Sequence, residues 1–279
     1  MPTSVRFLRH FVNPHVFVRL CYNLVMNPKT RPWYKRPMML LLSVLVLLIS
    51  VWLVWFVMQI IQNVSLIRAG KPTSMEQRQR KQLEASITSQ MANTKVSSAD
   101  LARMEEGAYP VYGNPKAPFH LVVFIDYECP YSKQVAPVLR DVMRTHADDL
   151  YVVVRDFPIT EIHPDAERSA IAANCVFALG GREAYWNYFD RLFVTQGSHG
   201  AAQLRSLALQ SGITDIQFDR CASDATRLQQ AQRSFQEGLN VGVAGTPTFF
   251  INGYRIQGAM DATAFDIAID QARQKSAKP

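Results

Sequence analysis

The strongest pattern along the chain is one long apolar run. From Met38 to Met58 no residue is charged, and only Ser43 and Ser50 are polar. As a helix this run spans about 31 Å, close to the hydrocarbon thickness of a bilayer. It is too long for a signal-peptide core, and no small-residue cleavage site follows it. The pattern therefore predicts an uncleaved transmembrane helix, bounded at residues 38–61, in preference to the core helix of a soluble protein.

Residues 62–107 are mostly polar and predict a linker that is at least partly helical. Apolar residues recur in this linker at roughly helical spacing: Met75, Leu83, Ile87 and Met91. Two interpretations stay open. Either the linker is a solvated spacer, or residues 75–91 form a short coiled coil that pairs two copies of the chain as a homodimer.

A domain of mixed strands and helices is predicted over residues 108–279. Branched and aromatic residues predict buried strands at His120–Asp126 and Leu150–Arg155. A helix from Cys129 to about His146 lies between them. The periodicity is then helical over about residues 160–240, in these segments: Pro164–Leu179, Glu183–Phe193, Ala201–Gln210 and Asp224–Leu239.

The end of the chain predicts a hairpin and a last helix. Thr248–Asn252 and Tyr254–Gln257 are strand-like, and Asn252-Gly253 is a strong two-residue hairpin signal. Asp261 is a suitable N-cap for a helix that ends near Gln274. The order of strand, helix, strand, helical block, hairpin and helix defines an α/β domain.

Charge predicts how the chain crosses the membrane. The segment 1–37 has no acidic residue, and its basic residues account for the whole formal net charge of +7: Arg6, Arg9, Arg19, Lys29, Arg31, Lys35 and Arg36. The positive-inside rule places this tail in the cytoplasm and the domain in the periplasm of a bacterium. The pI of about 9.3 thus indicates contact with the inner membrane, and we expect no nucleic acid as a partner. The tail is an interfacial segment or an element that docks a partner.

Cys129 is the residue whose surroundings suggest chemistry. It lies where the first strand gives way to a helix, and Pro130 occupies the first helical position, where a missing N–H is harmless. The free N–H groups and the positive dipole end of such a helix favour a thiolate over a thiol. Cys129 is therefore a candidate nucleophile. The alternative is a buried, inert cysteine.

Two segments carry a resemblance to a known family. Asp126-Tyr-Glu-Cys-Pro-Tyr-Ser-Lys133 resembles the active-site segment of DsbA-like thiol:disulfide oxidoreductases of the thioredoxin superfamily. Gly242-Val-Ala-Gly-Thr-Pro-Thr-Phe-Phe-Ile-Asn-Gly253 resembles the cis-proline loop of that family and the strand after it. The region from Phe157 to Cys175 looks like the start of its inserted helical domain. The resemblance implies a thioredoxin fold with a helical insertion, here preceded by one transmembrane helix.

The resemblance also implies roles for individual residues. Cys129 is the attacking sulfur, which Pro130 and Tyr131 tune. Thr246 and Pro247 form the facing cis peptide, which pairs with an extended substrate. His163 is close to a position where the family often has histidine, and we interpret it as structural. Asp126 either caps the strand end or aids proton transfer.

One position departs from the family pattern. Where the family has Cys-x-x-Cys, this chain has Ser132 in place of the second cysteine. Cys129 therefore has no adjacent thiol to close a disulfide with, although the Ser132 hydroxyl could bond to its thiolate. The sequence predicts thiol–disulfide exchange through one cysteine, by way of mixed disulfides with cysteine-containing envelope proteins or glutathione. The rival hypotheses are a redox-inactive scaffold or binding module and, more weakly, an iron–sulfur monothiol protein.

The remaining cysteines lie on both sides of the predicted membrane. Cys21 would stay reduced in the cytoplasm. Cys175 and Cys221 are candidates for a structural disulfide; two separate buried thiols or a resolving role are the alternatives. The histidines are scattered and none has zinc-ligand spacing with a cysteine, so we expect no metal and no cofactor.

Overall fold

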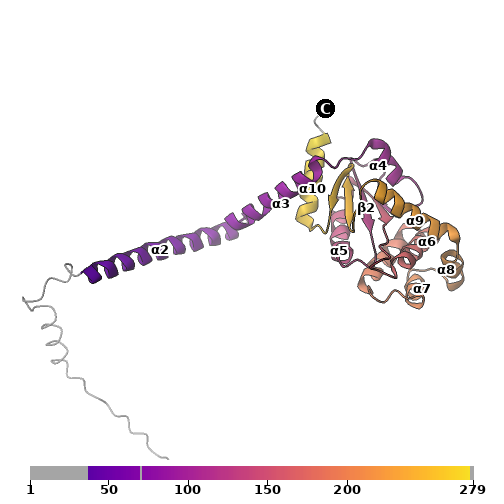
Figure 1. The fold of residues 1–279 in the computed structure, drawn as a ribbon, viewed down its shortest axis with the longest axis horizontal. Coiled ribbons are helices and arrows are strands. Elements are labelled where there is room, and N and C mark those ends of the chain that lie inside the picture. The colour runs from indigo at the N-terminus through magenta and orange to yellow at the C-terminus, as the bar shows by residue number, and fades with distance from the viewer. Residues whose placement is uncertain (1–36, 70, 277–279) are drawn as a thin grey trace, which may run out of the picture. The chain divides into compact units, whose positions relative to one another are not determined.

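The computed structural model describes residues 37–69 and 71–276, which form two units divided after Gln77. The first contains α2 (Pro37–Arg68), seen in Figure 1. Among the described residues, Met39–Leu66 is the one stretch long and apolar enough to cross a membrane, with mean hydropathy 2.9. The span predicted at residues 38–61 lies within α2. The predicted cytoplasmic tail, with Cys21, lies outside the described residues.

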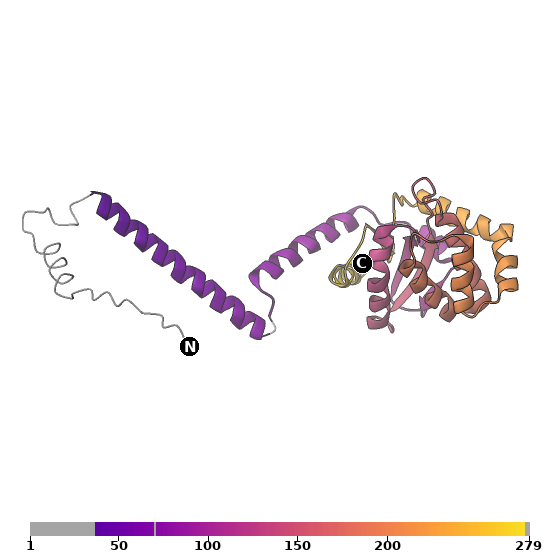
Figure 2. The ribbon, with the colours of Figure 1, turned by 90° about the horizontal axis from the view of Figure 1, so that it is seen from below.

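The second unit is built on a five-stranded sheet in the order β1-β3-β2-β4-β5. Helices pack around this sheet, as Figure 2 shows. Its central strands, β2 (Phe119–Ile125) and β3 (Leu150–Asp156), are parallel, and the other neighbouring pairs are antiparallel. The remaining strands are β1 (Val111–Gly113), β4 (Thr248–Ile251) and β5 (Tyr254–Gln257). The two strands predicted around Cys129 are confirmed, and the short edge strand β1 was missed.

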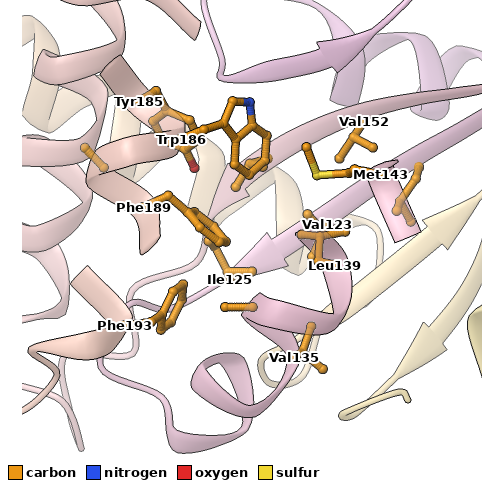
Figure 3. Close-up of a cluster of buried hydrophobic side chains, with 14 of the residues drawn as sticks. Val123, Ile125, Val135, Leu139, Met143, Val152, Tyr185, Trp186, Phe189 and Phe193 are labelled. Carbon is orange, nitrogen blue, oxygen red and sulfur yellow. The ribbon is translucent and has the colours of Figure 1, made fainter. Parts of the chain in front are cut away.

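Side chains of β2 alternate between two apolar layers, as the period of a strand requires. Leu121, Val123 and Ile125 belong to the larger cluster, which includes residues of α5 (Pro130–Thr145), α6 (Ala166–Val194) and α10 (Ala262–Ser276). Figure 3 shows α5 residues of this cluster beside the aromatic side chains of α6. Val122 and Phe124 belong to the second cluster, on the other face, with Met104 and Phe250. The sheet is therefore covered on both faces.

The predicted helical insertion lies between β3 and β4, as expected. It consists of α6, α7 (Ala201–Gln210), α8 (Asp215–Ala222) and α9 (Ala225–Asn240). The two helices predicted before residue 194 are one element broken at Gly181, which has a φ of 71°. The sequence did not predict the short α8. A disulfide joins Cys175 of α6 to Cys221 of α8, which confirms the predicted pairing over two separate thiols.

The compact unit begins at Arg78 and not at residue 108, so the predicted linker needs correcting. Ile87 and Met91 of α3 (Ser74–Ala92) are buried in the larger cluster, and Leu83 packs against it. Of the four apolar residues proposed for a coiled coil, only Met75 is exposed. Three of the four residues therefore pack within a single copy of the chain, and the segment from Arg78 onward is not a solvated spacer.

A second helix of this segment, α4 (Ser98–Glu105), is fastened by a buried arginine. Arg155 of β3 is fully buried and donates to the Met104 carbonyl at 2.7 Å and to the Ser234 hydroxyl of α9 at 3.1 Å. It also pairs with Glu237 and lies 3.8 Å above the ring of Tyr109. A buried charge is stable only with such partners. Arg155 thereby joins α4, β3 and α9.

The hairpin and the last helix form as predicted. Asn252 and Gly253 both have positive φ, 47° and 84°, as the tight turn requires. The Asp261 carboxylate accepts the N–H of Ala264 at 2.8 Å and so caps α10.

Candidate functional site

Cys129 is held at the junction that the sequence predicted. β2 ends at Ile125, and α5 begins at Pro130, with Cys129 as its N-cap. The Cys129 N–H donates to the Asp126 carbonyl at 3.1 Å, and the Cys129 carbonyl accepts the Lys133 N–H at 3.0 Å. Its side chain makes no capping bond, and the residue as a whole is 5% exposed. The sulfur therefore lies at the N-terminus of a 16-residue helix, with a small accessible surface.

The turn before β4 lies directly against this sulfur. The Thr246–Pro247 peptide is cis, as the family resemblance implied. The Cys129 thiol donates to the Thr246 carbonyl at 3.2 Å. The Thr246 hydroxyl is buried without a hydrogen-bond partner among the described residues. Segments 117 residues apart thus meet at one point, and the carbonyl expected to pair with a substrate is occupied by the thiol.

The other residues of the motif lie on two sides of the helix start. Pro130 is exposed and Tyr131 is 61% exposed, so both flank the sulfur on the surface. Ser132 is buried, and its hydroxyl accepts the Asp126 N–H at 3.5 Å. In the described part of the chain no hydrogen bond joins Ser132 to Cys129. The expected support of the thiolate by this hydroxyl is therefore not formed here.

Asp126 organises the turn from inside. Its carboxylate is fully buried and accepts three N–H groups: Glu128 N at 2.8 Å, Ile159 N at 2.9 Å and His163 Nδ1 at 2.8 Å. The backbone bond between Ile159 and His163 closes the loop after β3. Both roles considered for Asp126 thus remain compatible with its position. His163, interpreted as structural, is part of this site.

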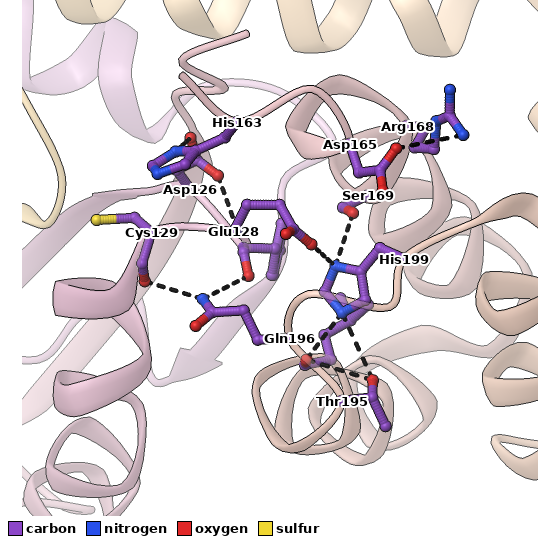
Figure 4. A network of polar contacts seen from close by, with 12 residues as sticks. Asp126, Glu128, Cys129, His163, Asp165, Arg168, Ser169, Thr195, Gln196 and His199 are labelled. Carbon is purple, nitrogen blue, oxygen red and sulfur yellow. Dashed lines mark hydrogen bonds and ion pairs between the residues drawn. The ribbon is translucent and has the colours of Figure 1, made fainter.

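A second buried pair was missed by sequence reasoning. Glu128 lies against His199, which is fully buried beyond the end of α6 (Figure 4). The His199 Nε2 contacts the Leu192 carbonyl at 2.9 Å, and its Nδ1 lies 3.0 Å from the Ser169 hydroxyl. Burial raises the pKa of Glu128, and the nearby imidazole opposes that rise. The pair links the turn before α5 to the helical insertion.

Gln196 strengthens the same link. Its side-chain amide donates to the carbonyls of Tyr127 at 2.9 Å and Cys129 at 3.0 Å, as Figure 4 shows for Cys129. Two backbone acceptors next to the sulfur are thereby satisfied by the loop that follows α6. No local pattern marks Gln196 or His199, because both act on residues about 70 positions away.

Asp156 is a further buried acid at this end of the sheet. It ends β3 opposite Ile125, so it lies beside the turn that begins at Asp126. The Asn174 side chain donates to its carboxyl group at 2.7 Å. Burial, with a smaller contribution from the charge of Asp126, raises the pKa of Asp156 to about 6. This acid therefore titrates near neutral pH.

The polar groups gathered around Cys129 are imidazoles and carboxylates. Across residues 37–69 and 71–276, no group of three or more His, Cys, Asp and Glu side chains is arranged to hold an ion.

Comparison with known proteins supports this reading of the geometry. The family model described as Thioredoxin matches residues 105–271. The Na(+)/H(+) antiporter NhaA 1 of Salinispora arenicola is 33% identical over 165 residues, which are 58% of this chain and 24% of that protein. The NhaA 1 of Mycolicibacterium gilvum is 31% identical over 165 residues, covering 58% and 26%. The chain spans about a quarter of the length of these relatives.

Solved structures show the same fold. The thiol-disulfide exchange protein alpha-DsbA2 of Wolbachia pipientis superposes with a TM-score of 0.56 at 21% identity, over 67% of this chain and 96% of that one. A periplasmic thioredoxin-like protein of Salmonella enterica serovar Typhimurium gives 0.55 at 21% identity, over 64% and 98%. The thioredoxin fold of DsbA-like proteins, predicted from two short segments, is thus confirmed.

Proposed function

The chain belongs to the thioredoxin family, and on that premise we propose that it is a membrane-tethered thiol–disulfide exchange protein acting through Cys129 alone. The observation that carries the proposal is the position of one sulfur. It lies at the N-terminus of α5, 3.2 Å from the Thr246 carbonyl of the cis-proline turn, with Ser132 where a second thiol would stand. Reactive cysteines of proteins often lie at helix N-termini, and the turn places backbone groups directly beside the sulfur.

The chemistry follows from having one sulfur. The Cys129 thiolate attacks one sulfur of a partner disulfide, a new S–S bond forms, and the partner's other sulfur leaves with the electron pair of the broken bond. Because Ser132 cannot attack that adduct, the mixed disulfide persists until an outside thiol resolves it. Envelope proteins with cysteines, or glutathione, are the proposed partners.

The proposed location is the bacterial inner membrane, with the tail in the cytoplasm and the domain in the periplasm. The apolar helix α2 and the basic residues before it support this orientation. The similarity to part of proteins named as Na(+)/H(+) antiporters also supports a membrane setting for this domain. The Cys175–Cys221 disulfide is consistent with an oxidising compartment.

Trapping the adduct tests the proposal. Cells that express the full chain should contain reducible high-mass species on a non-reducing gel. A Cys129→Ala variant should lose all of them, whereas Cys21→Ala, as the matched control, should keep them. Ser132→Cys should reduce their amount, because a second thiol at this position can release the partner. If the species persist without Cys129, another group is reactive and the proposal fails.

A second candidate is a scaffold or binding module. The observation in its favour is that the Cys129 side chain is only 5% exposed and its thiol is already bonded to Thr246. Complementation separates the two functions. If Cys129→Ser restores the envelope phenotype of a deletion strain as fully as wild type, the domain acts by binding and not by exchange.

A further inference from the structure

The imidazole of His163 is held by the carboxylate of Asp126, which acts as a hydrogen-bond acceptor. Asp126 accepts the backbone N–H groups of Glu128 and Ile159, so it is an acceptor toward His163 Nδ1 at 2.8 Å as well. A neutral imidazole so bound has its proton on Nδ1 and its lone pair on Nε2. The second nitrogen is therefore the basic one.

That second nitrogen is open. In the described part of the chain no group is hydrogen-bonded to Nε2 of His163, and the side chain is 16% exposed.

The loop does not depend on the imidazole for its shape. The His163 N–H donates to the Ile159 carbonyl at 2.9 Å, and the His163 carbonyl accepts the Ala166 N–H at 3.0 Å. The bond from Ile159 N to Asp126 already joins this loop to the active-site turn. The ring thus adds a chemical group to a loop that its backbone bonds hold.

The same carboxylate residue holds the reactive sulfur. The Asp126 carbonyl accepts the Cys129 N–H at 3.1 Å, so His163 and Cys129 are fastened to one residue (Figure 4). Proteins use an imidazole oriented by an acid to move protons to and from sulfur. In this chain it accompanies the absence of a second thiol at Ser132.

The geometry points to His163 as a base in the release of the mixed disulfide, an inference that rests on the proposed exchange at Cys129. His163 accepts the proton of the outside thiol that resolves this disulfide. The proton of the incoming thiol passes to Nε2, its sulfur attacks the partner sulfur, and a new S–S bond forms between them. The old bond breaks with its electron pair on Cys129, which leaves as a thiolate. Asp126 is a positioning residue that holds the ring.

Such help is needed because ordinary thiols are mostly protonated at neutral pH. With a pKa of about 8.5, about 3% of a thiol is ionised near pH 7. A dithiol protein avoids this limit with its own second cysteine. A one-cysteine protein depends on thiols from solution, so a base beside the adduct raises the rate at which it is released.

The test compares two attacking thiols on one preformed adduct. The full chain, carrying Cys21→Ala and solubilised in detergent, is converted to its Cys129–glutathione disulfide, and release is followed by mass spectrometry. One attacking thiol is glutathione, mostly protonated at neutral pH; the other is cysteine methyl ester, whose thiol is largely ionised there. His163→Gln should slow release by glutathione at least about tenfold and release by cysteine methyl ester less than about twofold. Asp126→Asn should show the same selectivity, and His146→Gln, as the matched control, should change neither rate.

Each result decides the matter. Equal slowing with both thiols means that the substitution only distorts the site, and no slowing means that His163 takes no proton; either overturns the inference. If a variant does not fold, the wild-type chain still answers: release rates over a series of thiols that depend on thiolate concentration alone exclude a base. If wild type forms no adduct at Cys129, the proposed function fails, and this inference with it.

Discussion

Replacing Asp156 by asparagine should stabilise the protein at neutral pH and remove part of its pH dependence. The side chain is buried at the end of β3, where one hydrogen bond, from Asn174, supports it. Burial raises its pKa from 3.8 to about 6. Asparagine has nearly the same shape and keeps a carbonyl oxygen for the Asn174 donor. The substitution therefore removes the charge and little else.

The magnitude follows from the two pKa values. The interval from 3.8 in the unfolded chain to about 6 in the folded one corresponds to about 3 kcal/mol. Because the folded pKa is the higher one, the folded state binds the proton more tightly. The stabilising contribution is thus fully present below about pH 4 and is lost as the pH rises through about 6. Near pH 7 the ionised carboxylate destabilises wild type by about 3 kcal/mol, and Asp156→Asn avoids this.

Urea unfolding near pH 4 and near pH 7, followed by the fluorescence of the buried Trp186, measures the effect. The difference in unfolding free energy between the variant and wild type should shift by about 2.4 kcal/mol in favour of the variant between the two pH values, because about 0.6 kcal/mol of the effect is already present at pH 4. Any constant effect of the substitution cancels in this comparison. Asp148→Asn, which removes an exposed carboxylate, is the control. A difference that is the same at both pH values would refute the assigned burial cost.

Further predictions concern the insertion, the domain boundary and the site. Replacing both Cys175 and Cys221 by alanine should destabilise the domain by about 4 kcal/mol, since the disulfide closes a loop with a sequence separation of 46; an unchanged urea midpoint would contradict this. Met91→Ala should reduce the unfolding free energy by about 2–5 kcal/mol, whereas a residue in a solvated linker would leave it unchanged. Gln196→Leu should speed alkylation of Cys129 severalfold by freeing the turn, and an unaltered rate would show that this amide does not restrain the sulfur.

The central strands were predictable because their signal is local. Runs of branched and aromatic residues mark β2 and β3, and Asn252-Gly253 marks the hairpin, since both patterns express steric preferences of the backbone. β1 has three residues and no such run, and it is defined only by its pairing with β3. A short strand that is defined by pairing with its neighbour has little recognisable pattern in its own sequence.

The domain boundary was misplaced for a related reason. Ile87 and Met91 are visible as apolar positions in a polar helix, yet the sequence does not say which surface they cover. A second copy of the chain and the domain of the same chain satisfy the pattern equally. Likewise, the hydrogen bond from Arg155 to the Met104 carbonyl is decided by tertiary packing. The sequence does not show that Arg155 is buried, so it does not show that its charge needs partners.

In the candidate site, too, local motifs were found from the sequence and long-range pairs were missed. Cys129 and Thr246 were found because each lies in a short motif, and the fold brings them together. Glu128 and His199 were not, because a pair separated by so many residues has no spacing to recognise. His163 was noticed and assigned a structural role, since nothing in the sequence shows that Asp126 holds one of its nitrogens and leaves the other free.

Two buried acids at neighbouring strand ends have different surroundings, and that difference defines their roles. Parallel pairing brings the ends of β2 and β3 together, so Asp126 and Asp156 share one edge of the sheet. Three N–H donors surround the carboxylate of Asp126, as an anion requires, whereas one donor supports Asp156. The charge of Asp126 adds to the burial that raises the pKa of Asp156 to about 6, so Asp156 takes up a proton as the pH falls below neutral. The acid whose donors suit an anion is thus the one residue that holds both Cys129 and His163.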